Sequence, residues 1–409
     1  MRHLPVYCAA VAASLLCTEA SAEVPIGGTN GWKVSAGALV RPRLFIDSGR
    51  DLVEGDFVER EYVTQRAQLS LSAQHNRGHR VFVQLQDVRQ WGEENGPANF
   101  RAQGFGAHQA YAEIALPEDF SIRLGRQELV LDDHRLIGNL VWAQRGFSFS
   151  GATVRGKAGP VKLTALGFVI SEDDVDPDGS ADGTQPPAQL LGLHAHYPGG
   201  KAFSGSAMFL SRRTGGAADE TRHTAGIFAK GSASGLSYQL DAYTQMGTLG
   251  EEDISAWLAA ARVGYTLDMK YKPGITVWYE AVSGDGEATG AFDTLYATNH
   301  KFYGEMDFFL NIPRHTQNLG LVDVGGRLML RAAKPWWLYV DVHNFSTMEE
   351  NPNGDTALGT EINAALKWIV APGLMMRTVY GIMLPEDGLR GAQDPDTEHM
   401  LFVTTSLSF

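Results

Sequence analysis

The feature that most constrains the fold is a repeated alternation of apolar and polar residues, in segments of about ten, from Trp32 to the carboxyl end. Successive side chains of a β-strand point to opposite faces, so each segment would have one apolar and one polar face. One segment places Val63, Ala67, Leu69 and Leu71 opposite Thr64, Arg66, Gln68, Ser70 and Ser72. We count about eighteen such segments, which favours a transmembrane β-barrel with its apolar faces toward lipid.

The connections between these segments alternate in length, as in an up-and-down antiparallel barrel with short periplasmic turns and long extracellular loops. Short connections are predicted at His75–Gly78, Leu116–Phe120, Gly156–Pro160, Tyr197–Lys201, Gly231–Gly235, Asp268–Gly274, Ala332–Pro335 and Ala371–Gly373. Long connections are predicted at Asp47–Arg60, Gln90–Gly104, Asp132–Gly146, Glu172–Pro187, Thr214–Glu220, Thr248–Glu252, Ser283–Asn318, Thr347–Thr356 and Pro385–Thr397. This order predicts an all-β chain with both termini in the periplasm.

Hydropathy and charge agree with this prediction. No run of about eighteen apolar residues follows residue 22, which excludes a helical membrane span. The mean hydropathy of −0.16 is compatible with a barrel, because lipid-facing and lumen-facing residues alternate. The formal charge of −13 argues against nucleic acid as a partner. The alternative is a soluble sandwich or propeller, but neither requires this loop asymmetry.

The two ends of the chain carry targeting signals. Residues 1–22 are typical of a secretory signal peptide, with Arg2 at the start, an apolar stretch at Leu4–Leu16 and a cleavage site at Ala20–Ala22. Both cysteines of the chain lie in this signal, so the mature barrel, residues 23–409, would contain no disulfide.

The last segment alternates up to Phe409, and a terminal phenylalanine on such a strand resembles the signal recognised by the barrel-assembly machinery. Aromatic residues near turn-side strand ends would form an interfacial girdle: Trp32, Tyr197, Phe203, Tyr265, Trp336, Trp337 and Trp368. The sequence therefore predicts a bacterial outer-membrane protein, with membrane lipid and the assembly machinery as partners.

Arginines recur on the polar faces of the predicted strands. The guanidinium group is always charged and pairs bidentately with carboxylates, so an arginine-lined lumen suits an anionic solute such as a polyuronate. The candidates for this solute path are Arg41, Arg43, Arg66, Arg89, Arg126, Arg155, Arg262, Arg327, Arg331 and Arg377, with Arg123 as a further candidate. A bulge could change the face on which Arg89, Arg123 and Arg126 lie.

A second role for these arginines is to brace the barrel wall. In that role they would pair with acidic residues of the lumen: Asp87, Glu113, Asp241, Glu280, Asp341 and Glu361. Wall bracing and solute binding are compatible, so the sequence leaves both open.

One acidic segment resembles the first half of a calcium-binding loop, with Asp174, Asp176, Asp178, Gly179 and Asp182. Alternating oxygen ligands can surround a hard cation while the glycine permits a sharp turn. However, Gln185 stands where a bidentate glutamate is expected, so a solvated acidic loop is the alternative. Asp285, Glu287 and Asp293 form a weaker second candidate.

The sequence carries no recognisable catalytic motif. Gly231–Gly235 has alanine where the serine of a Gly-x-Ser-x-Gly elbow must stand, and no His-Glu-x-x-His pair occurs. His194 and His196 share one strand face, but two histidines without a third ligand indicate lining residues. We therefore expect no enzymatic activity and, apart from calcium, no cofactor.

Several segments, in this order, resemble the alginate export family of outer-membrane barrels: Val83–Asp87, Gly125–Leu129, Asp133, Arg135–Gly138, Trp142, Ser283–Asp285, Phe292–Tyr296, His300, Tyr303–Gly304 and Asp307. The likeness covers most of residues 32–409. The resemblance implies an eighteen-stranded barrel with an electropositive constriction through which an anionic polysaccharide leaves the cell.

Our leading hypothesis is an outer-membrane channel that passes an anionic solute, an acidic (alginate-like) polysaccharide or oligosaccharide, by weak repeated binding to lumen arginines. The first alternative is a general or nutrient-uptake porin for small organic acids. The second is a non-conducting structural or adhesive barrel, plugged by the long loop Ser283–Asn318.

Overall fold

The computed structural model describes residues 23–48, 60–93, 104–171, 187–216, 219–333, 335–390 and 397–409. The predicted signal peptide lies outside these residues. Within them, one 19-stranded antiparallel sheet contains nearly all of the regular structure. Its strands are β1 (Val24–Thr29), β2 (Trp32–Asp47), β3 (Arg60–His75), β4 (Arg80–Gln90), β5 (Gly106–Ala115), β6 (Ser121–Gln127), β7 (Phe149–Ala158), β8 (Val161–Ser171), β9 (Ala188–Tyr197), β10 (Ser204–Thr214), β11 (Glu220–Ala233), β12 (Leu236–Leu249), β13 (Glu252–Thr266), β14 (Gly274–Val282), β15 (Leu321–Ala333), β16 (Trp336–Ser346), β17 (Ala357–Ala371), β18 (Leu374–Pro385) and β19 (Glu398–Ser408).

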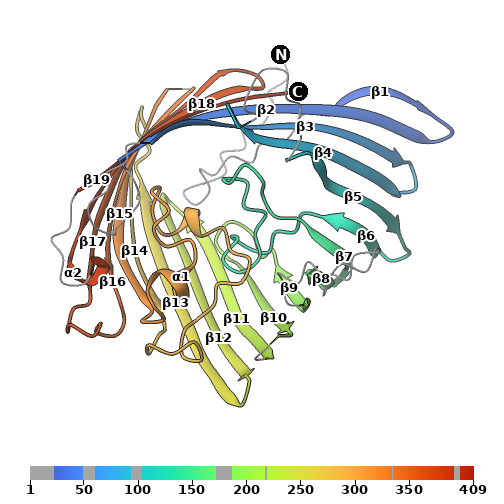
Figure 1. Ribbon diagram of the computed structural model, residues 1–409. Coiled ribbons are helices and arrows are strands. Elements are labelled where there is room, and N and C mark those ends of the chain that lie inside the picture. Colours follow the sequence, from blue (N-terminus) through green and yellow to red (C-terminus); the bar gives the residue numbers. More distant parts are fainter. Residues whose placement is uncertain are drawn as a thin grey trace.

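Strands β2 to β19 form a closed barrel (Figure 1). Each pairs with its neighbours in sequence, and β19 closes the ring by pairing with β2 from Leu39 to Asp47. The prediction of about eighteen strands is confirmed. The additional strand β1 pairs with the first part of β2, where Val24 lies opposite Ala36. Strands β1 and β19 therefore share one edge of β2.

Side chains alternate between the outer surface and the lumen, as the sequence predicts. In β3, Leu69 is 58% exposed, whereas its neighbour Ser70 is 2% exposed. Exposed large apolar residues occur on nearly every strand of the barrel, because this face meets lipid. The other face of each strand points into the lumen.

The connections only partly follow the predicted alternation. The prediction of a long loop at Thr248–Glu252 is wrong, because only Gly250 and Glu251 separate β12 from β13. Gly250 has a positive φ of 59°, which glycine adopts without steric cost and which this tight turn requires.

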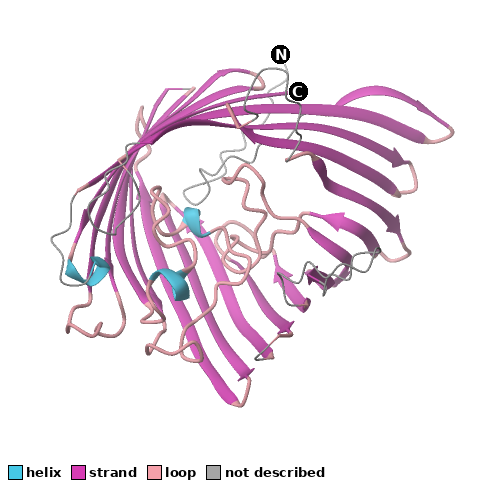
Figure 2. Cartoon of the chain, in the orientation of Figure 1, coloured by secondary structure: helices cyan, strands magenta, loops and turns pink. Residues whose placement is uncertain are grey.

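Two outer connections fold back into the barrel: the β6–β7 loop (residues 128–148) and the β14–β15 loop (residues 283–320) (Figure 2). They pair with each other through a parallel bridge between Ile137 and Tyr296. The β14–β15 loop contains two short helices, η1 (Asn299–Lys301) and α1 (Ile312–His315); a third, α2 (Asp387–Arg390), follows β18. No helix among the described residues is long and apolar enough to cross a membrane.

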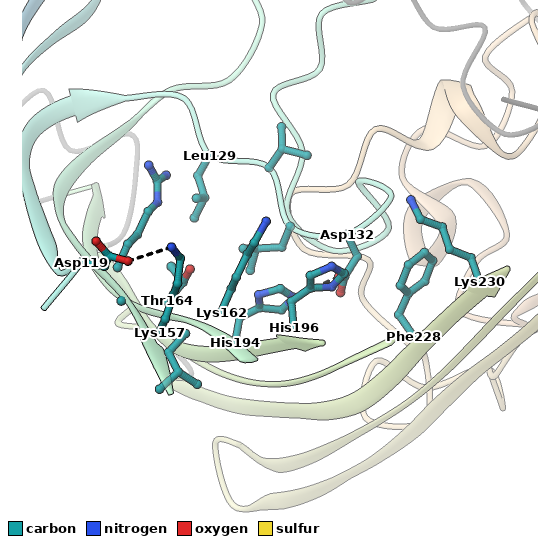
Figure 3. A pocket seen from close by; sticks show the side chains of 15 residues that line it. Asp119, Leu129, Asp132, Lys157, Lys162, Thr164, His194, His196, Phe228 and Lys230 are labelled. Carbon is teal, nitrogen blue, oxygen red and sulfur yellow. Dashed lines mark hydrogen bonds and ion pairs between the residues drawn. The ribbon is translucent and has the colours of Figure 1, made fainter. Parts of the chain in front are cut away.

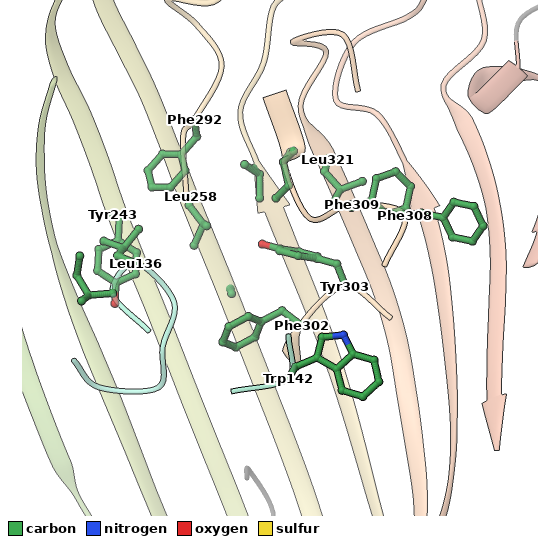
Figure 4. Close-up of a cluster of buried hydrophobic side chains, with 14 of the residues drawn as sticks. Leu136, Trp142, Tyr243, Leu258, Phe292, Phe302, Tyr303, Phe308, Phe309 and Leu321 are labelled. Atoms are coloured by element: carbon green, nitrogen blue, oxygen red, sulfur yellow. The ribbon is translucent and has the colours of Figure 1, made fainter. Parts of the chain in front are cut away.

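A large buried apolar cluster lies where these two loops meet the inner wall (Figure 4). Leu136 and Trp142 of the first loop and Phe292, Phe302 and Tyr303 of the second belong to it. The barrel therefore contains a packed core within its lumen, made by loops and not by the strands alone.

Candidate functional site: the lumen and its basic recess

Two predicted path arginines hold the β6–β7 loop against the wall. Arg41 on β2 donates from Nη1 to the carbonyl of Val141 (2.7 Å) and from Nη2 to the carbonyl of Ala143 (3.1 Å). Arg66 on β3 donates from Nη2 to the same carbonyl of Ala143 (2.6 Å) and from Nε to the carbonyl of Gln144. Both arginines are almost completely buried, so loop anchoring accounts for much of their hydrogen-bonding capacity.

Trp142 links this loop both to the wall and to the β14–β15 loop. The guanidinium carbon of Arg43 lies 3.7 Å from the centroid of the Trp142 ring, a cation–π contact. The Trp142 ring also stacks on His300, with centroids 3.7 Å apart and planes 3° from parallel. Its Nε1 donates to Asp307 Oδ2 (2.7 Å). Arg43 thus stabilises the junction of the two loops.

Arg135 of the β6–β7 loop crosses to the opposite wall. Its Nη1 and Nη2 donate to the two carboxylate oxygens of Glu280 on β14, at 2.7 Å and 3.0 Å, and Nη1 also donates to the hydroxyl of Tyr303 (3.1 Å). The Arg135 guanidinium carbon lies 3.5 Å from the Phe302 ring centroid. Arg262, a predicted path residue on β13, pairs with the same Glu280 carboxylate (2.9 Å from Nε).

A second buried network fastens the β14–β15 loop to β16 and β18. Glu305 Oε1 accepts from Arg377 Nη2 (2.5 Å) and from the hydroxyl of Tyr339 (2.8 Å). His300 lies between Asp307, 2.6 Å from its Nδ1, and Glu305, 3.1 Å from its Nε2. Burial alone would lower the pKa of His300, but these two carboxylates reverse the effect and raise it.

Glu361 on β17 binds the backbone of the same loop. Its Oε1 accepts from the amide nitrogens of Glu305 (2.7 Å) and Met306 (3.1 Å). Gly304 has a φ of +87°, and a Cβ at this position would lie 2.3 Å from Glu361 Oε1. Glycine is therefore required at residue 304 for this close approach.

The remaining inward-facing candidates differ in their surroundings. Arg327 pairs with Asp341 at 2.6 Å and 2.5 Å, and Arg123 pairs with Glu113 at 2.6 Å. Arg331 lies 5.3 Å from the ring centroid of Trp337. Several acids that the sequence suggested as wall braces therefore do pair with lumen arginines.

Two candidates lie on the other face of the sheet. Arg89 lies opposite Gln65, and Gln65 points to the outer surface as Leu69 does. Arg89 also binds Asp87 at 2.6 Å. Arg126 pairs with Ser150 and has the parity of Leu124, which is 47% exposed. The predicted lumen positions of Arg89 and Arg126 are thus wrong, because no bulge reverses their parity.

The sequence analysis missed two further lumen arginines. Arg212 on β10 binds Glu220 and Asp293, each at 2.7 Å, and Arg222 on β11 binds Glu220 at 2.8 Å. The alternation of side chains along each strand would have identified both as lumen residues. Arg212 shares a strand face with Leu210, and Arg222 shares one with Thr224. Burial would raise the pKa of Asp293, but the guanidinium groups of Arg212 and Arg222 lower it.

The predicted calcium loop, with Asp174, Asp176, Asp178 and Asp182, lies outside the described residues. Within the described ranges, no group of three or more histidines, cysteines or carboxylates is arranged to hold a metal ion. The weaker candidate in the β14–β15 loop is not assembled, since Asp293 faces Arg212.

Beneath the β6–β7 loop, a recess of about 520 Å³ opens on the inner wall of β7, β8, β9 and β11 (Figure 3). Its lining combines basic, acidic and apolar side chains. We call it the basic recess; its defining residues are Arg155, Lys157, Lys162, Lys230, His194, His196, Asp119, Asp132, Leu129, Leu131, Leu163 and Phe228.

The basic recess has an excess of positive charge. Lys157 and Lys162 lie directly opposite each other at the β7–β8 turn, an arrangement that is unfavourable unless an anion or water screens it. Lys157 pairs with Asp119 at 3.0 Å, but both groups are exposed. Among the described residues, neither Arg155 nor Lys162 has a hydrogen-bonding or ion-pairing partner. Of the predicted path arginines, only Arg155 belongs to this recess.

The closed barrel, lipid-facing apolar surface and polar lumen define a bacterial outer-membrane channel protein. The sequence pattern of the family described as "Alginate export" matches residues 33–336. The chain belongs to this family, as its motifs predicted.

Solved structures show the same barrel fold. The outer membrane protein OprD from Pseudomonas aeruginosa is 16% identical, with a TM-score of 0.58, covering 92% of this chain and 94% of that one. OccAB1 from Acinetobacter baumannii is 13% identical, with a TM-score of 0.62, covering 92% and 96%. At this identity the likeness concerns the fold alone. No curated protein gives a significant match.

Proposed function

We propose that this channel passes a carboxylated solute, an acidic saccharide of the kind that the family description suggests. The basic recess would bind this solute weakly as it moves through the lumen. The observation that carries the proposal is the surplus of cations in that recess. Because the chain as a whole has a formal charge of −13, these lumen cations are a local feature and not a reflection of composition.

The lumen cations differ in whether their charge is balanced inside the protein, and this difference supports the proposal. Arg41, Arg66 and Arg377 bind loop carbonyls or buried acids, so much of their charge is balanced inside the protein. Arg155 and Lys162 face the recess without such partners among the residues described. Conduction requires weak, repeated binding, and partly solvated cations meet that requirement better than buried ion pairs do.

A small organic acid is the second candidate solute. It is favoured by the two loops that pack inside the lumen, since they reduce the cross-section available to a polymer. A carboxylate is common to both candidates, so the charge argument is the same for either.

Planar-bilayer recordings of the purified protein in a KCl gradient would test the proposal. The native channel should show a reversal potential on the anion-selective side. The double variant Lys162→Gln/Lys230→Gln should move this potential toward the cation side, because two recess charges are removed. The matched control is Lys272→Gln, which removes a lysine from the β13–β14 turn, away from the recess.

An unchanged reversal potential in the double variant would remove the basic recess from the path. A native protein that inserts but never conducts would instead support the non-conducting barrel, in which the two loops act as a permanent plug.

A further inference from the structure

We propose that the outer face of strands β6 to β10 binds anionic lipids of the outer leaflet, with Arg126 and Arg213 each holding the phosphate of one headgroup. This site lies on the membrane side of the wall, opposite the basic recess, and it does not depend on the proposed function. The partner is a membrane lipid, recognised by its phosphate and by its acyl chains.

Both arginines point away from the lumen. Arg126 lies on the same strand face as Leu124, and Arg213 lies on the same face as the exposed Phe209. Each arginine is exposed and is the next-to-last residue of its strand, at the end from which the long loops emerge. Their guanidinium groups therefore meet the membrane and not the channel.

A row of opposite residues joins the two arginines across the sheet. This outer row runs from Arg126 through Ser150, Val169 and Gln189 to Arg213. Opposite residues of neighbouring strands point to the same face, so Ser150 and Gln189 add polar side chains between the arginines. Four steps of about 4.8 Å put the arginines about 19 Å apart, too far for one phosphate to reach both. Each arginine therefore takes its own headgroup.

The outer row lies near the top of the lipid-facing band. At the opposite end of these strands, Tyr197 and Phe203 are exposed aromatic residues, as expected at a membrane interface. Gly205 lies opposite Tyr197, and Arg213 follows it along β10. At about 3.3 Å per residue and a tilt of about 40°, Arg213 lies about 20 Å above that interface, in a band about 25 Å tall. This is close to the headgroups of the outer leaflet, where a charged residue that faces lipid costs little.

The described part of the protein leaves both guanidinium groups largely without acceptors. Arg126 makes one long hydrogen bond, from Nη1 to Ser150 Oγ at 3.5 Å. Arg213 has no hydrogen bond or ion pair among the described residues. Arg89 also points outward, but it binds Asp87 and so does not belong to the site. Because the guanidinium fork matches phosphate and pairs with it bidentately, a lipid phosphate at this depth supplies the acceptor.

Apolar side chains continue directly below the outer row. Leu191 and Leu193, the next outward residues of β9 after Gln189, are 59% and 62% exposed. Phe209 lies in the same way below Arg213 on β10. Acyl chains can pack on this surface while the phosphate reaches the arginines. Free phosphate would contact the arginines alone, so the amphipathic pattern favours a lipid.

Native mass spectrometry of the purified protein in a nonionic detergent would test the proposal. The probes are dipalmitoyl phosphatidic acid and dipalmitoyl phosphatidylcholine, which have the same chains but differ in headgroup charge. The native protein should bind two molecules of phosphatidic acid more tightly than it binds phosphatidylcholine. Arg126→Gln and Arg213→Gln should each weaken one of these two sites about fivefold, and the double variant should weaken both.

The matched control is the double variant Arg145→Gln/Lys230→Gln. It removes the same two positive charges from exposed side chains on the lumen side of the wall. Its affinity for phosphatidic acid should equal that of the native protein. Because Lys230 belongs to the basic recess, this control also separates the lipid site from the proposed function.

Three results would overturn the proposal. The first is native affinity for phosphatidic acid in Arg126→Gln/Arg213→Gln, which would remove the arginines from lipid binding. The second is equal affinity of the native protein for both lipids, which would exclude recognition of an anionic headgroup. The third is displacement of phosphatidic acid by an equal concentration of inorganic phosphate, which would make the occupant a free anion.

Discussion

Replacing Arg135 by methionine should release the β6–β7 loop from the barrel wall. Arg135 is 1% exposed and makes two hydrogen bonds to Glu280 and one to Tyr303. Breaking a buried ion pair by removing one partner costs about 3–5 kcal/mol. Because Arg262 remains bound to Glu280, we expect the lower end, about 3 kcal/mol of loop-docking free energy.

Hydrogen exchange of the amides that join the two loops would measure this loss. The amide of Gly138 donates to the carbonyl of Tyr296 (2.8 Å), and the amide of Tyr296 donates to the carbonyl of Leu136 (3.0 Å). If these amides exchange through local opening, a loss of about 3 kcal/mol accelerates them by about 100-fold. Strand amides of the barrel should be unaffected.

The matched control is Arg145→Met, which removes an exposed guanidinium from the same loop. It should leave exchange at Gly138 and Tyr296 unchanged. Native-like exchange in Arg135→Met would refute the reasoning, because the loop would then be held by its apolar contacts alone.

Three further predictions concern the same loops. Burial lowers the pKa of His134 to about 4. Because His134 of the undocked loop binds a proton at higher pH than that of the docked loop, docking should be strongest above pH 6.5 and weaken toward pH 4. Hydrogen exchange of the loop amides in His134→Gln should lose this pH dependence. Gly304→Ala should displace the β14–β15 loop from Glu361 and speed hydrogen exchange of the loop amides. Its control, Gly354→Ala, has a similar φ but lies in open space, so it should lower the free energy of unfolding by only about 1–2 kcal/mol, measured by thermal unfolding. Trp142→Ala should cost about 3–5 kcal/mol of loop docking, seen as larger current fluctuations in bilayers.

The barrel could be predicted from sequence because its information is local. The alternation at residues 63–72 and the turn residues between segments depend on neighbours within about ten positions. The error at Thr248–Glu252 is also local, because Gly250 permits a two-residue turn. Composition at these positions does not distinguish such a turn from the long loop that was predicted.

The lumen was less predictable because it depends on loops that return from far along the chain. Arg41 is a lumen residue by parity, but its partner Val141 is 100 positions away. Lys162 and Lys230 lie on the polar faces of separate strands, and only the closed barrel brings them to one recess. The family resemblance supplied the class of solute but no alignment of these positions.

The most direct test of the central claim is the reversal potential of the native channel in a gradient of potassium glucuronate. If the basic recess lies on the path of a carboxylated solute, glucuronate should carry a substantial share of the current, and the potential should lie on the anion side of zero. A potential close to the potassium equilibrium value would show that glucuronate is excluded, and would contradict the account.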